Sequence, residues 1–167
     1  MLLGINPGRY GGGLTGIPFT DPVVLSKNCH ISNNFRQISE LSSCFIYEVI
    51  ESIGGPEVFY QKHYITGLSP LGYVQNGKNL NYYDIENWQT IFDGIFEKWI
   101  EQQLDFGIER HVAYCIGKGE NYKQLIKINK DRKYFKKIMP LPHPRWVMQY
   151  NLKSKDFFIE QYRQALI

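Results

Sequence analysis

The chain has 167 residues, of which 43% are hydrophobic and 21% charged, a length and composition typical of one globular domain and not of a disordered protein. Its 19 basic and 16 acidic side chains give a net charge of +3, which permits nucleic-acid binding but does not by itself argue for it. The absence of a long apolar run argues against a membrane-spanning helix. The 3 cysteines are widely separated and never form a CxxC pair, which argues against a zinc or iron–sulfur centre.

The N-terminal part of the sequence predicts one strand, one loop and one helix. Residues 1–6 (MLLGIN) form an apolar run that is typical of a strand. A glycine-rich loop follows over residues 7–22, where two prolines argue against a helix. A broad apolar face then predicts a helix around residues 33–53, which we expect the Gly-Gly-Pro sequence at 54–56 to stop.

The central part predicts a strand, a tight turn and a long helix. Residues 63–70 contain the second strand, which ends at its proline, and Asn76-Gly77 is a strong hairpin-turn signal. Apolar residues recur at steps of three and four over residues 85–104, which predicts a single helix. Asp84 is its expected N-cap.

The C-terminal part predicts two more strands, each followed by a helix. Residues 111–117 and 135–141 are the expected strands, and residues 119–128 and 154–166 the expected helices. We interpret the lysines and arginines between 123 and 137 as a solvated surface rather than a phosphate-binding track. Because strands alternate with helices, we expect a three-layer α/β/α sandwich with a mainly parallel central sheet.

Two glycine-containing segments resemble phosphate-binding loops only in part. Gly11, Gly13 and Gly16 have the spacing of a dinucleotide-binding fingerprint. The IPFTDP sequence that follows is a poor start for the helix that such a site requires. The GYVQNGKN segment has Asn79 where a phosphate loop needs a hydroxyl for its metal, so we interpret it as a hairpin. A nucleotide-binding α/β module that uses the glycine-rich loop without chemistry stays open as the alternative function.

Two polar residues lie at predicted strand ends. Asn6 ends the first strand, and His143 follows the last one. Ligand sites of parallel α/β sheets form outside the carboxyl ends of the strands. We therefore expect Asn6 and His143 to reach one cleft.

Several segments together resemble a known family. GINPGRYGGGLTGIPFTDP at the start of the chain resembles the first motif of single-strand-selective monofunctional uracil-DNA glycosylases, and PHPRWVMQYN near its end resembles their second motif. SPLGYVQNGKNL and VAYCIGKGE resemble segments that lie between these motifs. The resemblance covers most of the chain in the right order. It implies an enzyme of DNA base-excision repair that hydrolyses the N-glycosidic bond of a damaged base without a cofactor or metal.

The resemblance also implies roles for individual residues. Asn6 would position the attacking water, and His143 would donate a hydrogen bond to the leaving base as negative charge develops on it. The backbone N–H of Ile5 would assist. Phe19 would stack on the flipped base, and Gly8 would leave room beside it.

The expected partner is DNA that contains a damaged or deaminated base. Arg145 and Trp146 would lie in a loop that wedges into the duplex, and Lys78 in the GKNL segment would contact DNA. We expect a monomer in the bacterial cytoplasm, associated with the nucleoid and not with a membrane. Family members carry helices ahead of the first motif, so we expect the domain of residues 1–167 to lack an N-terminal segment.

The sequence departs from the family pattern in its second predicted strand. GLSPL places Gly67 where the family has an asparagine that reads the base edge, and Ser69 where it has a cysteine. This departure is typical of a bacterial subgroup. We expect Ser69 to replace the amide in part and the space at Gly67 to favour a larger base, such as xanthine or hypoxanthine. Gly67→Asn is then expected to shift the preference toward uracil.

Overall fold

A computed structural model describes residues 1–167, which form two compact units. Unit 1 consists of Met1–Arg9 and Tyr64–Leu141, and unit 2 of Tyr10–His63 and Pro142–Ile167. Each unit therefore combines two segments that are distant in the sequence. None of the helices has both the length and the apolar character needed to cross a membrane.

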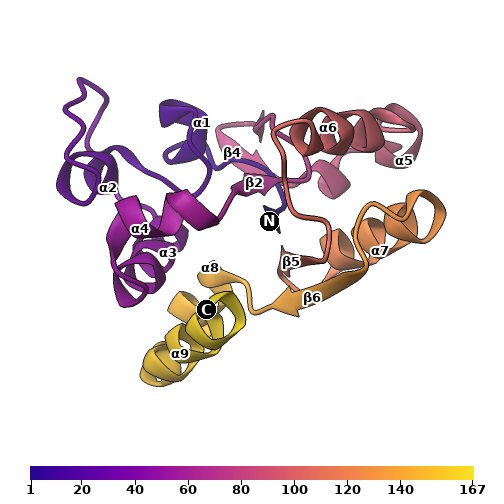
Figure 1. The fold of residues 1–167 in the computed structure, drawn as a ribbon. Coiled ribbons are helices and arrows are strands. Elements are labelled where there is room, and N and C mark those ends of the chain that lie inside the picture. The colour runs from indigo at the N-terminus through magenta and orange to yellow at the C-terminus, as the bar shows by residue number, and fades with distance from the viewer. The chain divides into compact units, whose positions relative to one another are not determined.

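Unit 1 is built on a four-stranded parallel sheet with the strand order β2-β1-β5-β6. Figure 1 shows β5 and β6 side by side in this sheet. The predicted α/β class with a mainly parallel central sheet is confirmed. The strands are shorter than predicted, and they comprise β1 (Leu2–Gly4), β2 (Ile65–Gly67), β5 (Val112–Ile116) and β6 (Lys137–Leu141).

The helices of unit 1 differ from the prediction mainly in the region of residues 84–104. The single helix expected over residues 85–104 is divided into α5 (Trp88–Ile91) and α6 (Ile95–Leu104). Gly94 is the N-cap of α6 and has a φ of 68°, a left-handed conformation that interrupts the helical path and that glycine adopts without strain. Asp84 is not the N-cap of this helix, because it closes the short 3₁₀ helix η1 (Tyr82–Asp84) in a capping box. The predicted helix after the third strand is confirmed as α7 (Glu120–Arg132) and is longer than expected.

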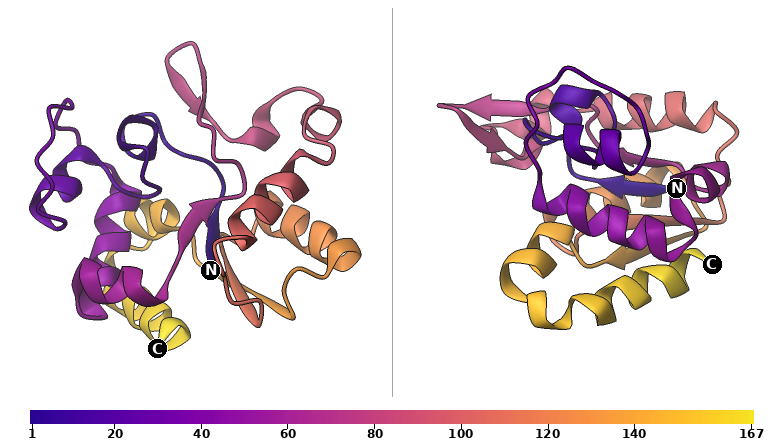
Figure 2. Two further views of the ribbon diagram at one scale, coloured as in Figure 1. Left: turned by 45° about the horizontal axis from the view of Figure 1, so that its top comes forward. Right: turned by 90° about the vertical axis from the view of Figure 1, so that its left-hand side faces the viewer.

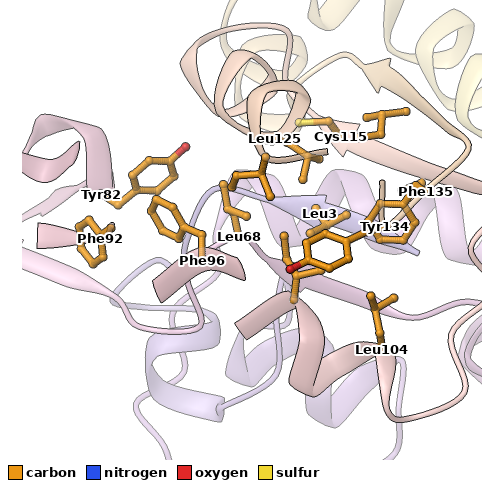
Figure 3. Packing of buried hydrophobic residues seen from close by; sticks show 14 of the residues in the cluster. Leu3, Leu68, Tyr82, Phe92, Phe96, Leu104, Cys115, Leu125, Tyr134 and Phe135 are labelled. Carbon is orange, nitrogen blue, oxygen red and sulfur yellow. The ribbon is translucent and has the colours of Figure 1, made fainter. Parts of the chain in front are cut away.

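The core of unit 1 is rich in aromatic side chains. Figure 3 shows these side chains together with apolar residues of the sheet, such as Leu3 and Cys115. Phe92 and Phe96 stack with ring centroids 5.0 Å apart, and Tyr82 meets Phe96 edge-on at 4.8 Å. Burial of such large rings is a main source of folding free energy. It fixes η1, which carries Tyr82, against the helices α5 and α6.

The predicted turn at Asn76-Gly77 is confirmed. It joins β3 (Tyr73–Gln75) to β4 (Lys78–Leu80) in an antiparallel hairpin, and both turn residues have positive φ, at 49° and 71°. Both views of Figure 2 show this hairpin extending beyond the parallel sheet. The interpretation of GYVQNGKN as a hairpin rather than a phosphate loop is therefore correct.

Unit 2 is helical, and most of the differences between the predicted and the observed helices lie in it. The helix expected around residues 33–53 begins only at Leu41. It ends at Ser52, just before the Gly-Gly-Pro sequence as predicted, but the same sequence also begins another helix. The loop of residues 7–22 also contains a short helix. The helices of unit 2 are α1 (Gly12–Thr15), α2 (Pro22–Lys27), α3 (Leu41–Ser52), α4 (Gly55–Lys62), α8 (Pro144–Tyr150), η2 (Leu152–Ser154) and α9 (Lys155–Leu166).

Two helices of unit 2 that the sequence did not predict, α2 and α8, begin at a proline. Pro22 and Pro144 each occupy the first helical position, where the missing N–H costs nothing and the fixed φ favours a helix. Helix α3 packs against α8 and α9, where the rings of Phe45 and Tyr162 meet edge-on at 5.3 Å. The Tyr162 hydroxyl donates to the carbonyl of Pro142 at 2.6 Å, which anchors the segment that leads into α8. The predicted closing helix is confirmed as α9.

Candidate active site

The side-chain amide of Asn6 lies just beyond the carboxyl end of β1 and is fixed by two backbone groups. Its Oδ1 accepts from the N–H of Tyr82 at 3.0 Å, and its Nδ2 donates to the carbonyl of Leu80 at 3.1 Å. These partners decide which way the amide points, because an N–H group must face the amide oxygen and a carbonyl must face the amide nitrogen. A carbonyl oxygen has two lone pairs, so Oδ1 can accept a second hydrogen bond, from a water. The structure thus gives Asn6 a fixed orientation from which it can hold a water.

Ser69 does not offer the free hydroxyl that a base-reading role needs. Its side chain is fully buried and accepts from the N–H of Leu71 at 3.2 Å. The same hydroxyl lies 3.1 Å from the Leu71 carbonyl and 2.7 Å from the hydroxyl of Tyr73. One donor and two lone pairs are satisfied by these three contacts. The expectation that Ser69 replaces the family's amide is not supported by this geometry.

The space expected at Gly67 is not present. A Cβ built on Gly67 would lie 2.6 Å from the carbonyl oxygen of Ser69 and 3.2 Å from both Asn6 Cα and Ile5 O. These are backbone atoms, which cannot move aside cheaply. Gly67 is therefore required for close packing of β2 against the segment after β1, and the expectation of an enlarged pocket at this position is wrong.

The loop after β1 is tied to the hairpin by a second hydrogen bond. The backbone N–H of Arg9 donates to Asn79 Oδ1 at 3.1 Å, which adds to the bond between Asn6 and Leu80. Gly8 lies half-buried within this loop, and Ile5 accepts from the N–H of Ser69 at 3.0 Å through its carbonyl. Lys78 is exposed on β4. The hairpin thus holds Lys78 on the same unit as Asn6, where its charge is accessible to an anion.

In unit 2, Phe19 has a backbone conformation that is rare for a bulky residue. Its φ is 54°, in the left-handed region, which costs a non-glycine residue about 1 kcal/mol or more. The surrounding turn is held by the hydroxyl of Thr15, which donates to the carbonyl of Thr20 at 2.7 Å and accepts from the N–H of Ile17. Strain that neighbouring hydrogen bonds maintain is a feature of functional sites. Stacking of the Phe19 ring on a base stays a prediction.

A buried aspartate that our sequence analysis did not single out fixes the end of this loop. Asp21 is fully buried, and its Oδ1 caps α2 by accepting from Val23 and Val24 at 2.9 and 3.0 Å. Its Oδ2 accepts from the N–H of Glu40 at 2.8 Å. The Asp-Pro pair at a helix start was the sequence signal that could have revealed this cap.

His143 is the N-cap of α8, and its ring is neutral at pH 7. Its Nδ1 accepts from the N–H of Arg145 at 3.2 Å. Burial, followed by the positive charge of Arg145, lowers the pKa of His143 from 6.5 to about 4. A neutral ring whose Nδ1 accepts must carry its proton on Nε2. His143 is therefore an uncharged N–H donor, which suits the role the resemblance implies.

Arg145 and Trp146 lie in the first turn of α8 and not in a loop, which corrects the expectation. Both are exposed, and Trp146 retains 46% of its accessible surface. The Trp146 ring meets Phe158 edge-on with centroids 5.6 Å apart. A helix turn supported by α9 holds both side chains more rigidly than a loop would. Their contact with DNA stays a prediction.

The glycine-rich loop is occupied by a carboxylate of its own chain. Glu40 Oε1 accepts from the N–H of Tyr10 at 3.1 Å, and the backbone of Gly11 also bonds to this carboxylate. A Cβ on Gly11 would lie 2.4 Å from Glu40 Oε2, so the fit is close. Burial is the main cause of the raised pKa of Glu40. Backbone amides that already hold a carboxylate are not open to a nucleotide phosphate, which counts against the nucleotide-binding alternative.

The sequence-predicted residues thus fall into two groups. Unit 1 holds six of them, and unit 2 holds the other four. That Asn6 and His143 serve one cleft stays a prediction. The residues of unit 1 are Ile5, Asn6, Gly8, Gly67, Ser69 and Lys78, and those of unit 2 are Phe19, His143, Arg145 and Trp146.

Comparison with known proteins identifies the family. The model of the uracil DNA glycosylase superfamily matches residues 1–167, so the match spans both units. The crystal structure of wild-type SMUG2 from Pedobacter heparinus is 44% identical in sequence and superposes with a TM-score of 0.92, covering 98% of this chain and 72% of that one. No functionally curated protein matches the chain significantly. The resemblance of the first and last motifs is thereby confirmed, and the chain belongs to the uracil DNA glycosylase superfamily as a monofunctional DNA glycosylase.

Proposed function

We propose that the chain removes uracil or a related deaminated base from DNA by hydrolysing its N-glycosidic bond. The observation that carries the proposal is the orientation of Asn6, whose Oδ1 is held by Tyr82 with a lone pair remaining for a water. Enzymes of this class must extrude the nucleotide from the helix before they can reach the bond. Phe19 is the residue proposed to stack on the extruded base, and stacking of this kind contributes about 1–3 kcal/mol.

In the proposed reaction the bond between C1′ and the base nitrogen breaks first, and both electrons leave with the base. The sugar becomes an oxocarbenium ion and the base an anion. An amide cannot accept a proton, so Asn6 positions the water that attacks C1′ and does not act as a general base. The proton that this water releases ultimately balances the charge of the departing base.

His143 is proposed to stabilise that departing anion. Its Nε2–H would donate to the base oxygen on which negative charge develops, and a neutral donor retains its proton throughout. Loss of a single donor of this kind costs about 3–4 kcal/mol of barrier. His143→Ala is expected to slow base release roughly a hundredfold or more while DNA binding is retained.

The base preference is the finer part of the proposal. No side-chain amide stands at Gly67, and the hydroxyl of Ser69 is already bonded to Leu71 and Tyr73. With no side chain of β2 committed to the uracil edge, discrimination among deaminated bases should be weak, because strong rejection requires a buried group that is left unpaired. We therefore propose xanthine and hypoxanthine as substrates beside uracil, since both present a similar carbonyl and N–H edge.

The test is release of a labelled base from oligonucleotides that carry uracil, xanthine or hypoxanthine, with an undamaged oligonucleotide as control. Release by the unmodified protein and its loss in Asn6→Ala would support the proposal. No release of any of these bases, or equal release by Asn6→Ala, would refute it. DNA binding is measured with the same oligonucleotides at several salt concentrations. Lys78→Ala and Arg145→Ala should each weaken binding and reduce its dependence on salt.

A further inference from the structure

A buried polar network connects to Asn6 through Tyr82 and includes Asn121, which has no role in the scheme above. Asn121, in the first turn of α7, is only 2% exposed. Its Nδ2 donates to the carbonyl of Gly4 at 3.0 Å, and its Oδ1 accepts from the hydroxyl of Tyr82 at 3.1 Å. A buried amide with good partners on both ends is expensive to break, because each lost bond leaves a group without water or protein to satisfy it.

Both partners of Asn121 are connected to Asn6. Gly4 is the last residue of β1 and precedes Asn6 by two positions. The backbone N–H of Tyr82 is the group that orients Asn6 Oδ1, at 3.0 Å. Asn121 therefore holds the strand that carries Asn6 and, through the hydroxyl of Tyr82, the residue that aims its amide.

The Tyr82 ring is fixed from its other sides as well. It is fully buried and meets Trp88 and Phe96 edge-on at 5.3 and 4.8 Å. Burial is the largest cause of the raised pKa of its hydroxyl, which stays protonated and able to donate. The ring packing restrains the ring, but the hydrogen bond to Asn121 is what connects it to the end of β1.

We propose that Asn121 and Tyr82 are positioning residues that set the orientation of Asn6 toward the attacking water. The proposal rests on the role of Asn6 in the function proposed above. A displacement of about 1 Å in a group that positions a reactant can cost roughly a hundredfold in rate. Loss of this network should therefore slow base release more than it weakens DNA binding.

Two pairs of variants test the proposal, each with a matched control in the same unit. Tyr82→Phe removes only the hydroxyl that bonds Asn121, and Tyr83→Phe removes the same atom from the next residue. Asn121→Leu removes the buried amide from α7. Asn129→Leu removes another amide of α7, which bridges the N–H and carbonyl of Phe135 at 2.8 and 2.9 Å.

Single-turnover release from a uracil oligonucleotide should fall about tenfold in Tyr82→Phe and more in Asn121→Leu, with both controls near the unmodified rate. The dissociation constant for an oligonucleotide with a tetrahydrofuran abasic analogue should change little. In an Asn6→Ala background, Tyr82→Phe should cause no further loss, because residues that act through one group are not additive. Nitrogen-15 NMR should show the side-chain amide resonance of Asn6 shifted by Tyr82→Phe and not by Tyr83→Phe.

The outcomes separate the two proposals. The positioning role is tested when the unmodified protein releases base and Asn6→Ala does not. It is overturned if Tyr82→Phe leaves the release rate unchanged, or if Tyr82→Phe lowers the rate by its full factor again in the Asn6→Ala background. If Asn121→Leu does not fold, Tyr82→Phe alone decides. If Asn6→Ala releases base normally, the function proposed for Asn6 fails, and the positioning role fails with it. An unshifted Asn6 resonance in Tyr82→Phe would refute the structural coupling even without any activity.

Discussion

Replacing Asn6 by aspartate tests the positioning role because it changes one atom, Nδ2, into an oxygen. Oδ1 keeps its bond from the N–H of Tyr82, but the new oxygen faces the carbonyl of Leu80, which Nδ2 met at 3.1 Å. A lost hydrogen bond that leaves a half-buried acceptor unpaired costs about 1–3 kcal/mol. For a chain of this length, each kcal/mol lowers the melting temperature by about 2–4 °C.

The same change makes the variant dependent on pH. A carboxylate next to a carbonyl oxygen is destabilised, so the pKa of the new side chain should be raised above its ordinary value. Below that pKa the carboxylic acid can donate to the Leu80 carbonyl and restore the network of Asn6. The sign follows from linkage. Stability and base release of Asn6→Asp should be highest at low pH and should fall as the pH rises through the raised pKa.

The assay is single-turnover base release and thermal unfolding of Asn6→Asp across a pH series, beside the unmodified protein and Asn6→Ala. Asn6→Ala cannot regain either hydrogen bond and should show no such rise at low pH. If release by Asn6→Asp instead increases with pH, the carboxylate is acting as a general base. That result would refute the conclusion that residue 6 only positions the water.

Three further changes test other parts of the site. Because the pKa of His143 is lowered from 6.5 to about 4, base release should be constant from neutral pH down to about pH 5 and should be lost as the ring is protonated near pH 4. The stability gained from the neutral ring should decline over the interval from pH 6.5 to about 4, where the unfolded chain binds the proton and the folded chain does not. Arg145→Ala should shift the loss of base release to higher pH, and a loss centred at pH 6.5 in the unmodified protein would contradict a neutral donor. Gly67→Asn should lower the melting temperature, because overpacking at this position costs about 1–3 kcal/mol of stability, and it should leave the ratio of uracil to xanthine release unchanged. A stable variant with an altered ratio would show that a pocket exists at this position. Phe19→Gly should relieve the strained backbone, so the melting temperature should stay nearly unchanged, but the variant should bind damaged DNA more weakly. An unchanged affinity for damaged DNA would exclude stacking by Phe19.

The errors in the helix predictions show how local signals compete. Apolar spacing over residues 85–104 fits one continuous helix, yet Gly94 in a left-handed conformation divides it. Gly54-Gly55-Pro56 ends one helix and begins another, and Pro22 and Pro144 each open a helix that the sequence did not predict. Glycine and proline mark boundaries reliably. Whether a boundary closes a helix or opens one depends on the apolar surface available to the residues beyond it.

Gly67 and Ser69 show the same difference between what the sequence predicts and what the structure shows. The sequence correctly reports that Gly67 and Ser69 replace an amide and a thiol of the family pattern. It does not report that the Ser69 carbonyl lies where a Cβ of Gly67 would be, or that the Ser69 hydroxyl is bonded to Tyr73. The residue type at a position tells which polar groups are present. Whether those groups can bind a ligand depends on whether neighbouring residues already hydrogen-bond to them.

The sequence by itself determined the parallel α/β class, the hairpin at Asn76-Gly77 and the family motifs that contain Asn6 and His143, because each is a pattern among residues close together in the chain. Only the tertiary structure decided what those residues can do. The amide of Asn6 takes its orientation from Leu80 and Tyr82, which lie 74 and 76 positions away, and the carbonyl of Gly4 is held by Asn121, 117 positions away. Such bonds form only after the strands have paired and the aromatic core has closed, and no local spacing of residues encodes them.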